Sequence, residues 1–351
     1  MNDIKICAVA KQLPKYSRET ADIIPMVELW LADHDERFKR KVTKIFEGAA
    51  VDKRYSIMAP EEVFTASSFE EKNAIYVREV KKLGTSVLQN ALQKTNWNPD
   101  SLDFIITVSC TGIMIPSLDA YIINDLGLKQ DIVRLPVTEM GCAAGVSGLI
   151  YASNFLKANP GKRAAIIAVE SPTATFQLND YSMANMVSAA IFGDGAACVL
   201  LSSENDAKGP KIVGEEMYHF KDASHMMGFD LTNHGLKMIL DPTVPEIIAD
   251  HFPNIIHPFL EKHGSHIDNV AHLIFHPGGR KIVQTVDELF GKLGKNIDDT
   301  REVLRLYGNM SSATVLYVLE RFLEKEIAPG EQGIILSFGP GFSAQRVLLE
   351  W

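Results

Sequence analysis

The chain has 351 residues, 46% of them apolar, and is therefore long enough to bury a large core in one or two domains. Its formal net charge of −9 at pH 7 argues against a nucleic-acid-binding protein, which would show a basic patch. None of its four cysteines forms a CxxC pair, so the sequence predicts neither a metal site nor a disulfide framework, and a reducing compartment is expected.

Two further features of the chain predict its location. The N-terminal segment 1–10 has no basic region followed by a long apolar run, so we expect no signal peptide. No stretch of the sequence reaches the roughly 20 apolar residues that span a bilayer. We therefore expect a cytoplasmic protein that neither crosses nor binds a membrane.

The first part of the chain alternates between strand and helix patterns. In chain order we expect a strand at 4–9, helical segments at 21–46 and 67–93, a strand at 104–108, a helix at 118–126, a strand at 132–136, a helix at 142–159, and strands at 164–169 and 196–202. The polar tract 203–210 is rich in turn formers and predicts a linker.

The second part of the chain continues the alternation. We expect a strand at 211–217, a helix at 244–263, a strand at 271–275, helices at 282–293 and 310–326, and two final strands. Strands that alternate with helices indicate a buried mixed sheet in each part. The predicted fold class is α/β, with an N-terminal half at 1–205, a C-terminal half at 206–351, and helices between the two sheets in a layered αβαβα body.

Three segments of the first half recur in the same order in the second. They are Gly141-Cys142 with Gly308-Asn309, Asp100-Ser101-Leu102 with Asp268-Asn269-Val270, and Phe192-Gly193-Asp194-Gly195 with Phe338-Gly339-Pro340-Gly341. Matched segments in a conserved order indicate a duplicated unit. The duplication places a cysteine and an asparagine at equivalent positions.

Cys142 follows a predicted strand and opens a predicted helix. At a helix start the backbone N–H groups and the positive end of the dipole favour the thiolate, although a small cysteine is also common in cores. Gly141 before it and the small residues 143–145 after it leave room for a substrate. We therefore interpret Cys142 as a nucleophile.

His276 and Asn309 complete a candidate active site. His276 ends an apolar strand and precedes Pro277-Gly278-Gly279, so it is well placed to face a cavity. Asn309 repeats the position of Cys142, where an amide is otherwise often only an N-cap. A thiol, an imidazole and an amide supply a nucleophile and a pair of donors for an oxyanion.

Papain-like proteases show the same order of Cys, His and Asn. Those enzymes carry a C-G-[SA]-C-[WY] segment near the mature N-terminus. Here the cysteine lies in mid-chain, in the segment Gly141-Cys142-Ala143-Ala144-Gly145. The duplicated architecture also differs, so we reject the protease interpretation.

The motifs that surround these residues are specific. They are Gly141-Cys142, FGDGAA at 192–197, HPGG at 276–279, YGNMSSA at 307–313 and FGPG at 338–341. Together they resemble the type III polyketide synthases, the chalcone synthase-like enzymes, in order and over nearly the whole chain. The related β-ketoacyl-acyl carrier protein synthases share the Cys-His-Asn set and the thiolase fold, but differ in the residues after the histidine and around the asparagine.

The resemblance implies a homodimer of five-layered thiolase-like subunits that uses coenzyme A thioesters without a bound cofactor. Cys142 would take an acyl group from an acyl-CoA starter and then hold the growing chain. His276 would help to keep Cys142 as thiolate. With Asn309 it would hydrogen-bond the thioester oxygen of malonyl-CoA during decarboxylation. Repeated condensation would be followed by cyclisation.

The resemblance also implies a substrate pocket. Phe192 matches the family's gatekeeper aromatic residue, and Thr175 and Ser311 keep small polar residues. Cys110 stands where plant chalcone synthases have Thr, Met238 replaces their second gatekeeper Phe, and Phe229 falls near a Gly. A flexible methionine suits an aliphatic acyl group, so alkylpyrone or alkylresorcinol-type products are expected rather than chalcone.

Coenzyme A carries phosphates, so its binding site should be basic. The resemblance places Lys53 and Arg54 in the phosphate-binding region, and Gly278 and Lys281 lie on the turn after His276. Two alternatives stay open at this point. One is a β-ketoacyl synthase III-like enzyme that performs a single condensation, and the other is a non-catalytic acyl-CoA-binding partner.

Overall fold

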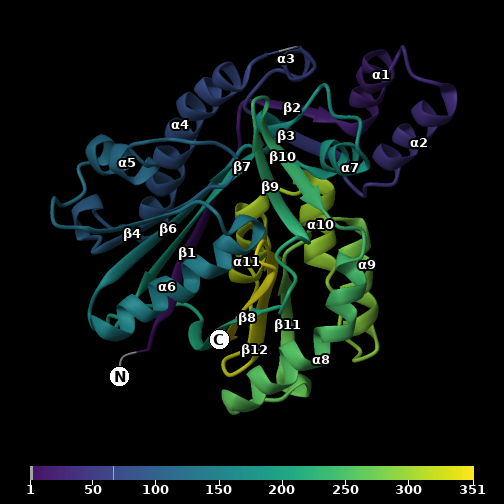
Figure 1. Ribbon diagram of the computed structural model, residues 1–351. Coiled ribbons are helices and arrows are strands. Elements are labelled where there is room, and N and C mark those ends of the chain that lie inside the picture. Colours follow the sequence, from purple (N-terminus) through teal and green to yellow (C-terminus); the bar gives the residue numbers. More distant parts are fainter. Residues whose placement is uncertain (1–2, 66) are drawn as a thin grey trace.

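The computed structural model describes residues 3–65 and 67–351, and Figure 1 shows its helices and strands. Within these ranges nine strands form one sheet in the order β11-β12-β13-β8-β1-β7-β6-β4-β5. The strands of the first half are β1 (Lys5–Gln12), β4 (Phe104–Val108), β5 (Val133–Val137), β6 (Arg163–Glu170) and β7 (Gly195–Ser202). Those of the second half are β8 (Lys211–His219), β11 (Val270–Phe275), β12 (Gln332–Gly339) and β13 (Ser343–Glu350).

The order and direction of the strands repeat between the halves. β4 and β6 run parallel, β6 pairs antiparallel with β7, and β7 pairs antiparallel with β1. β11 and β12 likewise run parallel, β12 pairs antiparallel with β13, and β13 pairs antiparallel with β8. This repeat confirms the predicted duplication. The halves join edge to edge where Lys5 on β1 pairs with Lys211 on β8.

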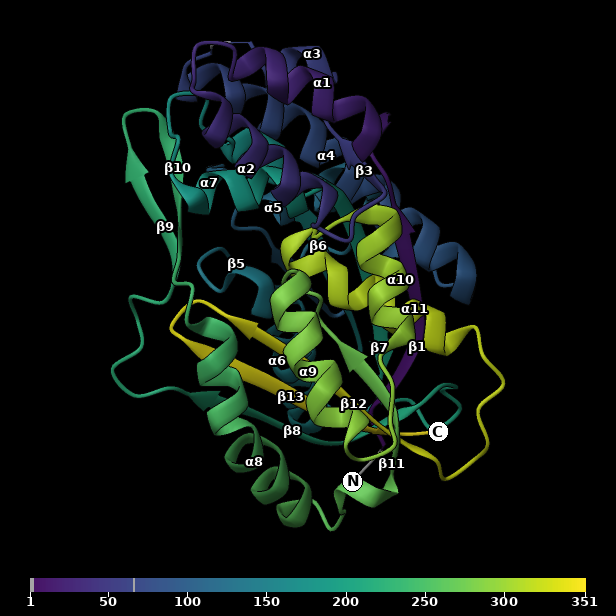
Figure 2. The same ribbon diagram turned by 90° about the vertical axis from the view of Figure 1, so that its right-hand side faces the viewer.

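Helices separate the two half-sheets and cover their outer faces. Helices α6 (Ala144–Ala158) and α11 (Thr314–Leu323) lie between the half-sheets, α4 (Phe69–Thr95) and α5 (Leu118–Leu126) cover the first, and α8 (Val244–Lys262) and α9 (Arg280–Gly291) cover the second. Figure 2 shows α8 and α9 in front of the second half-sheet. The five-layered αβαβα architecture is as predicted.

Strand β6 contributes side chains to the hydrophobic cores on both faces of the sheet. Every second residue from Ala164 to Ala168 packs in the core that contains α6 and α11. The residues between them, with Val169, pack in the core that contains α4 and α5. Both faces are fully buried, which explains why this strand is a continuous apolar run in the sequence.

The predicted helical segment 21–46 is in fact two helices. They are α1 (Thr20–Trp30) and α2 (Glu36–Glu47). The carboxylate of Asp35 accepts hydrogen bonds from two backbone N–H groups in the first turn of α2, both at 2.9 Å. Because Asp35 caps α2, its backbone is extended and the chain cannot continue as one helix.

A two-stranded ribbon, a β-hairpin and three helices lie outside the predicted elements. The ribbon is β2 (Tyr16–Glu19) paired antiparallel with β3 (Lys53–Ser56), the hairpin is β9 (Met227–Thr232) with β10 (Gly235–Leu240), and the helices are α3 (Pro60–Val63), α7 (Met183–Ile191) and α10 (Asp298–Tyr307). In Figure 1 the β9–β10 hairpin rises beside α7, on which β10 packs. These elements are short and partly exposed, so their apolar patterns are weak. They form much of the wall around the site described below.

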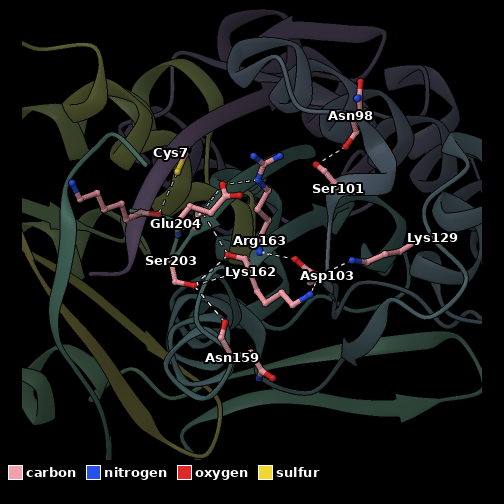
Figure 3. A network of polar contacts seen from close by, with 12 residues as sticks. Cys7, Asn98, Ser101, Asp103, Lys129, Asn159, Lys162, Arg163, Ser203 and Glu204 are labelled. Carbon is pink, nitrogen blue, oxygen red and sulfur yellow. Dashed lines mark hydrogen bonds and ion pairs between the residues drawn. The ribbon is translucent and has the colours of Figure 1, made fainter. Parts of the chain in front are cut away.

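A polar network fastens the predicted linker 203–210 to the edge of the first half-sheet (Figure 3). The Asp103 carboxylate accepts hydrogen bonds from Lys129 Nζ at 2.5 Å, from Lys162 Nζ at 2.9 Å and from the backbone N–H of Arg163 at 2.9 Å. Arg163 in turn donates from Nε to the carboxylate of Glu204 at 2.7 Å. The network thereby connects the starts of β4 and β6 with the linker that leads into the second half.

Candidate active site

Cys142 and Asn309 lie at the starts of the two central helices. Cys142 belongs to the 3₁₀ turn Gly141–Ala143 that precedes α6, and Asn309 precedes the 3₁₀ turn Ser311–Ala313 that leads into α11. The helices predicted at 142–159 and 310–326 therefore begin with tighter turns than expected. Because both central helices lie between the half-sheets, the duplication brings the thiol and the amide to one place.

The glycines around Cys142 allow parts of the protein to pack closely together. A Cβ atom added at Gly145 would lie 2.3 Å from the carbonyl oxygen of Ser312, in the second half. One added at Gly141 would lie 2.6 Å from Cδ of Pro340, and Gly141 has a positive φ of +50°. The second half therefore packs closely against both glycines, while Gly141 also lines the cavity that contains Cys142.

One cavity, called here the catalytic cavity, contains the three residues predicted to carry the chemistry. It encloses about 40 Å³ and is lined by Cys142, His276 and Asn309. The other predicted residues that line it are Cys110, Phe192, Phe229, Met238, Gly278 and Ser311. Phe229 and Met238 face each other across the β9–β10 hairpin, so this hairpin forms one wall.

Burial governs the protonation of Cys142. Burial raises the pKa of its thiol to about 11, although hydrogen bonds with Ser311 and Asn309 act in the opposite direction. The sulfur lies 3.6 Å from Oγ of Ser311. The expectation that the helix start alone favours the thiolate is therefore corrected. In the substrate-free site the thiol needs a group that accepts its proton.

His276 lines the same cavity as Cys142. It follows β11 and is 2% exposed, and its backbone N–H donates a hydrogen bond to the carbonyl of Leu336 at 3.0 Å. Neither ring nitrogen has a hydrogen-bond partner within the described part of the chain. Burial lowers the pKa of the imidazole to about 3, so the ring is neutral at pH 7. A neutral ring has one nitrogen that accepts and one that donates.

The amide of Asn309 is held in a defined orientation. Its Oδ1 accepts hydrogen bonds from the backbone N–H of Ser311 at 2.8 Å and from Oγ1 of Thr314 at 3.3 Å. Its Nδ2 therefore points the other way and donates to the carbonyl of Gly278 at 3.1 Å, on the turn after His276. Asn309 also forms a parallel backbone bridge with Phe192. The amide donor and the aromatic ring are thus positioned by the same backbone contact.

A buried carboxylate, Glu170, lies next to the catalytic cavity and was missed by the sequence analysis. It ends β6 and accepts hydrogen bonds from the backbone N–H of Cys110 at 3.0 Å, Oγ1 of Thr111 at 2.8 Å and Oγ of Ser312 at 2.5 Å. Burial raises the pKa of Glu170. A carboxyl group at the end of a fully apolar strand was the signal that could have identified it.

A second cavity, called here the side cavity, adjoins the first. It encloses about 80 Å³ and shares Pro172, Phe192 and Met238 with the catalytic cavity. Thr175, a predicted pocket residue, lines the side cavity and is not among the residues that line the catalytic one. Phe192 and Met238 therefore stand between two cavities.

A third and wider cavity also adjoins the catalytic cavity. It encloses about 630 Å³ and shares Ile191, Leu240, Gly278 and Ile282 with the catalytic cavity. Its cationic lining residues are Lys44, Arg280 and Lys281. A wide cavity with basic residues that meets the catalytic cavity suits a large, negatively charged substrate.

Arg54 does not take part in that basic lining. It is 6% exposed, and its guanidinium donates to the carbonyl of Ala189 and to Oγ1 of Thr20, both at 2.8 Å. Burial lowers its pKa to about 10. Arg54 lines the side cavity, away from Lys44 and Lys281, so the prediction that it binds phosphates is wrong. The guanidinium already holds β3 against α7.

Lys44 rather than Lys53 lines the wide cavity. The ammonium group of Lys53 lies 3.9 Å from the carboxylate of Glu19 and over the ring of Tyr55, and Lys53 does not line the wide cavity. Lys44 lines it from α2 and was not predicted. The signal was present in the basic face of α2, whose last turn carries this lysine.

Two kinds of feature are absent from residues 3–65 and 67–351. No group of three or more His, Cys, Asp or Glu side chains in these ranges is arranged to hold a metal ion. None of the helices found there has both the length and the apolar character required to cross a membrane.

The family models for chalcone and stilbene synthases match nearly the whole chain. The N-terminal domain model matches residues 4–205 and the C-terminal domain model matches residues 217–350. The phloroglucinol synthase of Pseudomonas fluorescens is 28% identical, with 99% of each chain covered. The 1,3,6,8-tetrahydroxynaphthalene synthase of Streptomyces peucetius is 30% identical and covers 99% of this chain and 93% of that protein.

Solved structures agree with these matches. The 1,3,6,8-tetrahydroxynaphthalene synthase of Streptomyces coelicolor, a bacterial type III polyketide synthase, superposes with a TM-score of 0.93. It is 27% identical, and 99% of each chain is covered. A polyketide synthase from the brown alga Ectocarpus siliculosus superposes with a TM-score of 0.90 at 26% identity, covering 100% of this chain and 98% of that one.

Proposed function

The chain belongs to the chalcone and stilbene synthase family of type III polyketide synthases, which are acyl-transferring enzymes, and we propose that Cys142, His276 and Asn309 carry out its chemistry. The observation that supports this assignment most is that all three line one small cavity, which meets a wide cavity with a basic lining. The sequence-predicted alternative of a non-catalytic acyl-CoA-binding partner does not account for that convergence.

The first step is transfer of the starter acyl group. The thiol of Cys142 attacks the carbonyl carbon of an acyl-CoA, and its proton passes to the neutral imidazole of His276. The thioester bond to coenzyme A breaks, and the departing sulfur takes the proton from His276. The products are an acyl thioester on Cys142 and free coenzyme A. Burial keeps the ring of His276 neutral, so a ring nitrogen is free to accept the proton. Burial also makes the ring a weak base, so His276 holds the proton only until the departing sulfur takes it.

The second step is decarboxylation of malonyl-CoA. Loss of CO₂ leaves negative charge on the thioester oxygen, and N–H groups of His276 and Asn309 donate hydrogen bonds to it. The ring of Phe192, beside Asn309, gives the leaving carboxylate an apolar environment that favours neutral CO₂. The resulting carbanion attacks the acyl carbon on Cys142 and releases the cysteine sulfur.

Repetition and ring closure complete the reaction. The extended chain returns to Cys142 for each new malonyl-CoA and finally cyclises, and we propose alkylpyrone or alkylresorcinol-type products. The aliphatic Met238 and the volume beyond it support an alkyl-bearing product. We also propose that coenzyme A binds in the wide cavity, near Lys44, Gly278 and Lys281, and that no other cofactor is needed.

We propose a cytoplasmic homodimer as the working form. Two exposed apolar residues support the dimer: Ile115 is 92% exposed and Val133, on the edge strand β5, is 47% exposed. Exposed apolar side chains along a sheet edge are typical of a covered interface. Gel filtration with light scattering tests the dimer, and a monomeric mass would contradict it.

Product analysis with purified protein tests the proposed activity. We expect malonyl-CoA and an acyl-CoA starter to give products with several added ketide units, with release of CO₂, and Cys142→Ala to give none. A single two-carbon extension would favour the β-ketoacyl synthase III-like alternative. Binding of acyl-CoA without CO₂ release would favour the non-catalytic partner.

A further inference from the structure

We infer that a cavity beside the turn of the β9–β10 hairpin binds hydrogen phosphate, and that the bound anion fastens the hairpin to helix α4. This inference is independent of the proposed function, because it involves neither Cys142 nor coenzyme A. The cavity, called here the polar cavity, encloses about 270 Å³. Among the residues that the structure describes, it shares no lining residue with the catalytic, side or wide cavity. Its walls come from the start of α4, the loop 177–180 and the hairpin turn.

Lys72, near the start of α4, brings a buried cation to the polar cavity. The residue is 6% exposed, and its ammonium group donates a hydrogen bond to the carbonyl of Phe176. An ammonium group has three donors. Within residues 3–65 and 67–351 the other two donors have no partner, and no carboxylate forms an ion pair with this lysine. Because a buried charge is costly unless an opposite charge accompanies it, Lys72 favours an anion in the cavity.

Lys237 and Asp180, which also line the polar cavity, form an ion pair. Nζ of Lys237 lies 3.7 Å from Oδ2 of Asp180, so these two charges offset each other. Oδ1 of Asp180 accepts a hydrogen bond from the backbone N–H of Ser182 at 2.9 Å. Oδ2 is buried and accepts no hydrogen bond from the described residues. The cavity therefore combines the unpaired cation of Lys72 with a carboxylate oxygen that can accept a hydrogen bond.

Hydrogen phosphate matches both of these groups. Its oxygen atoms can accept hydrogen bonds from Lys72, and such charge-assisted hydrogen bonds are about twice as strong as neutral ones. The proton that phosphate retains at pH 7 can be donated to Oδ2 of Asp180. Sulfate carries no proton at this pH, so its oxygens would face the Asp180 carboxylate without a hydrogen bond, which lowers affinity. The polar cavity should therefore prefer phosphate to sulfate.

The rim of the polar cavity supplies further donors. Asn179 and His234 are exposed, and their side chains make no hydrogen bond with the part of the chain that the structure describes. The hydroxyl of Thr232, in contrast, already donates to the carbonyl of Gly235 at 2.9 Å. The volume of about 270 Å³ admits the anion together with several waters, each of which takes about 30 Å³ in the liquid. Waters can bridge the anion to donors at the rim.

The position of the polar cavity connects the anion to the hairpin. The hairpin turn packs on the start of α4, since a Cβ atom added at Gly235 would lie 3.1 Å from the ring of Phe69 and 3.2 Å from Nε2 of Gln177. The strands of this hairpin carry Phe229 and Met238, which line the catalytic cavity. An anion bound between α4 and the hairpin turn would therefore restrict the motion of that wall.

Isothermal titration calorimetry with sodium phosphate at pH 7 and constant ionic strength tests the site. Lys72→Met removes the charge but keeps the length of the side chain, and should weaken phosphate binding about ten- to one-hundred-fold. Lys82→Met is the matched control, because Lys82 also lies on α4 but its ammonium group is exposed and pairs with Glu79 at 2.9 Å. The control variant should bind phosphate as the wild type does.

Asp180→Asn tests the selectivity with a second variant. The amide keeps the oxygen that accepts from Ser182 and places an N–H donor where Oδ2 was. The affinity for sulfate relative to phosphate should therefore rise about ten-fold. This variant keeps the inference testable if Lys72→Met misfolds. Equal binding of phosphate and sulfate by the wild type would overturn the inference, because the Asp180 carboxylate would then not face the anion.

Hydrogen exchange measured by mass spectrometry separates the polar cavity from the wide cavity, whose basic residues can also bind phosphate. Phosphate should slow amide exchange in the hairpin at 227–240 in the wild type and in Lys82→Met, but not in Lys72→Met. Slower exchange confined to α9, which borders the wide cavity, would overturn the inference. Phosphate binding that Lys72→Met leaves unchanged, or no phosphate binding by the wild type, would also overturn it.

Discussion

The sulfur of Cys142 lies 3.6 Å from the hydroxyl oxygen of Ser311, so a residue of the first half meets a residue of the second at the centre of the molecule. The same hydroxyl lies 3.5 Å from the sulfur of Cys110. The hydroxyl group of Ser311 therefore lies within hydrogen-bonding distance of two thiols, those of Cys110 and Cys142. The hydrogen bond between Cys142 and Ser311 lowers the pKa of Cys142, against the larger effect of burial.

Ser311→Ala should make Cys142 less reactive. Without the hydroxyl the thiolate loses a donor, so its pKa rises further and the rate of alkylation by iodoacetamide near pH 9 should fall about two- to ten-fold. The matched control is Ser147→Ala, because Ser147 is also buried but donates to the carbonyl of Ala143 at 3.1 Å. Equal alkylation of Ser311→Ala and wild type would contradict the role of this hydroxyl.

Asn309→Asp should slow decarboxylation far more than acylation. The substitution keeps Oδ1, which accepts from Ser311 and Thr314, but replaces the Nδ2 donor with an oxygen. Loss of one such donor lowers the rate of CO₂ release from malonyl-CoA by about 10²–10³-fold. Loading of Cys142 by a starter acyl-CoA, followed by mass spectrometry, should change much less. A parallel loss in both measurements would show that Asn309 only supports the fold.

Lys44→Ala and Lys281→Ala should each raise KM for coenzyme A thioesters about three- to ten-fold. Both lysines line the wide cavity, and each substitution removes a cation that can bind phosphate. The effect should disappear with pantetheine thioesters, which lack the nucleotide phosphates, and should weaken at high salt. Lys53→Ala is the matched control because Lys53 lies outside that cavity. The same KM increase with pantetheine thioesters would argue against phosphate binding.

Asp103→Asn should destabilise the protein by about 1 kcal/mol near pH 7. Burial alone would raise the pKa of Asp103, but hydrogen bonds from Lys129, the Arg163 N–H and Lys162 outweigh burial and lower it. A carboxylate with a lowered pKa stabilises the fold above its ordinary pKa of about 3.9, and this contribution is lost as the pH falls through the folded value. Denaturant titrations of both proteins should therefore converge at low pH. A constant difference down to pH 3 would contradict the assignment.

Gly145→Ala should destabilise the protein by about 1–3 kcal/mol. The new Cβ would lie 2.3 Å from the carbonyl oxygen of Ser312, so α6 must move away from the second half. Thermal unfolding and Cys142 alkylation measure the two consequences. Gly291→Ala is the control, since an added Cβ there has no atom within 4 Å. An unchanged unfolding midpoint in Gly145→Ala would contradict the close approach.

The sequence could predict the parts of the fold that depend on long apolar runs. Strand β4 and helix α5 lie where the pattern predicts them, because Phe104–Val108 is fully buried and α5 ends at Gly127 in a left-handed conformation. The β9–β10 hairpin was missed, although the turn at Asn233-His234-Gly235 between two mixed runs is a hairpin signal. Several of its side chains, among them Phe229 and Met238, line the catalytic cavity rather than a core, so its apolar pattern is irregular.

In the candidate site, too, some residues could be predicted from the sequence and others could not. The motifs predicted that Cys142, His276 and Asn309 line one cavity, since each lies at or next to the end of a regular element. They could not predict that the side chain of Arg54 points into the protein. Its strand has only four residues and no alternation of apolar and polar residues that would show which face is buried. They also could not predict Glu170, whose hydrogen-bond partners come from segments about 60 and 142 residues away.

Because of the arrangement of α6 and α11, the catalytic activity should depend on how accurately the two halves pack against each other. The nucleophile comes from the start of one central helix and the amide donor from the start of the other. Neither half alone holds a complete site, so an isolated half that folded correctly would still be catalytically inactive. If the chain were cut within the 203–210 linker and the two halves were mixed, catalysis would return only if they reassembled accurately enough to restore the hydrogen bonds of the site.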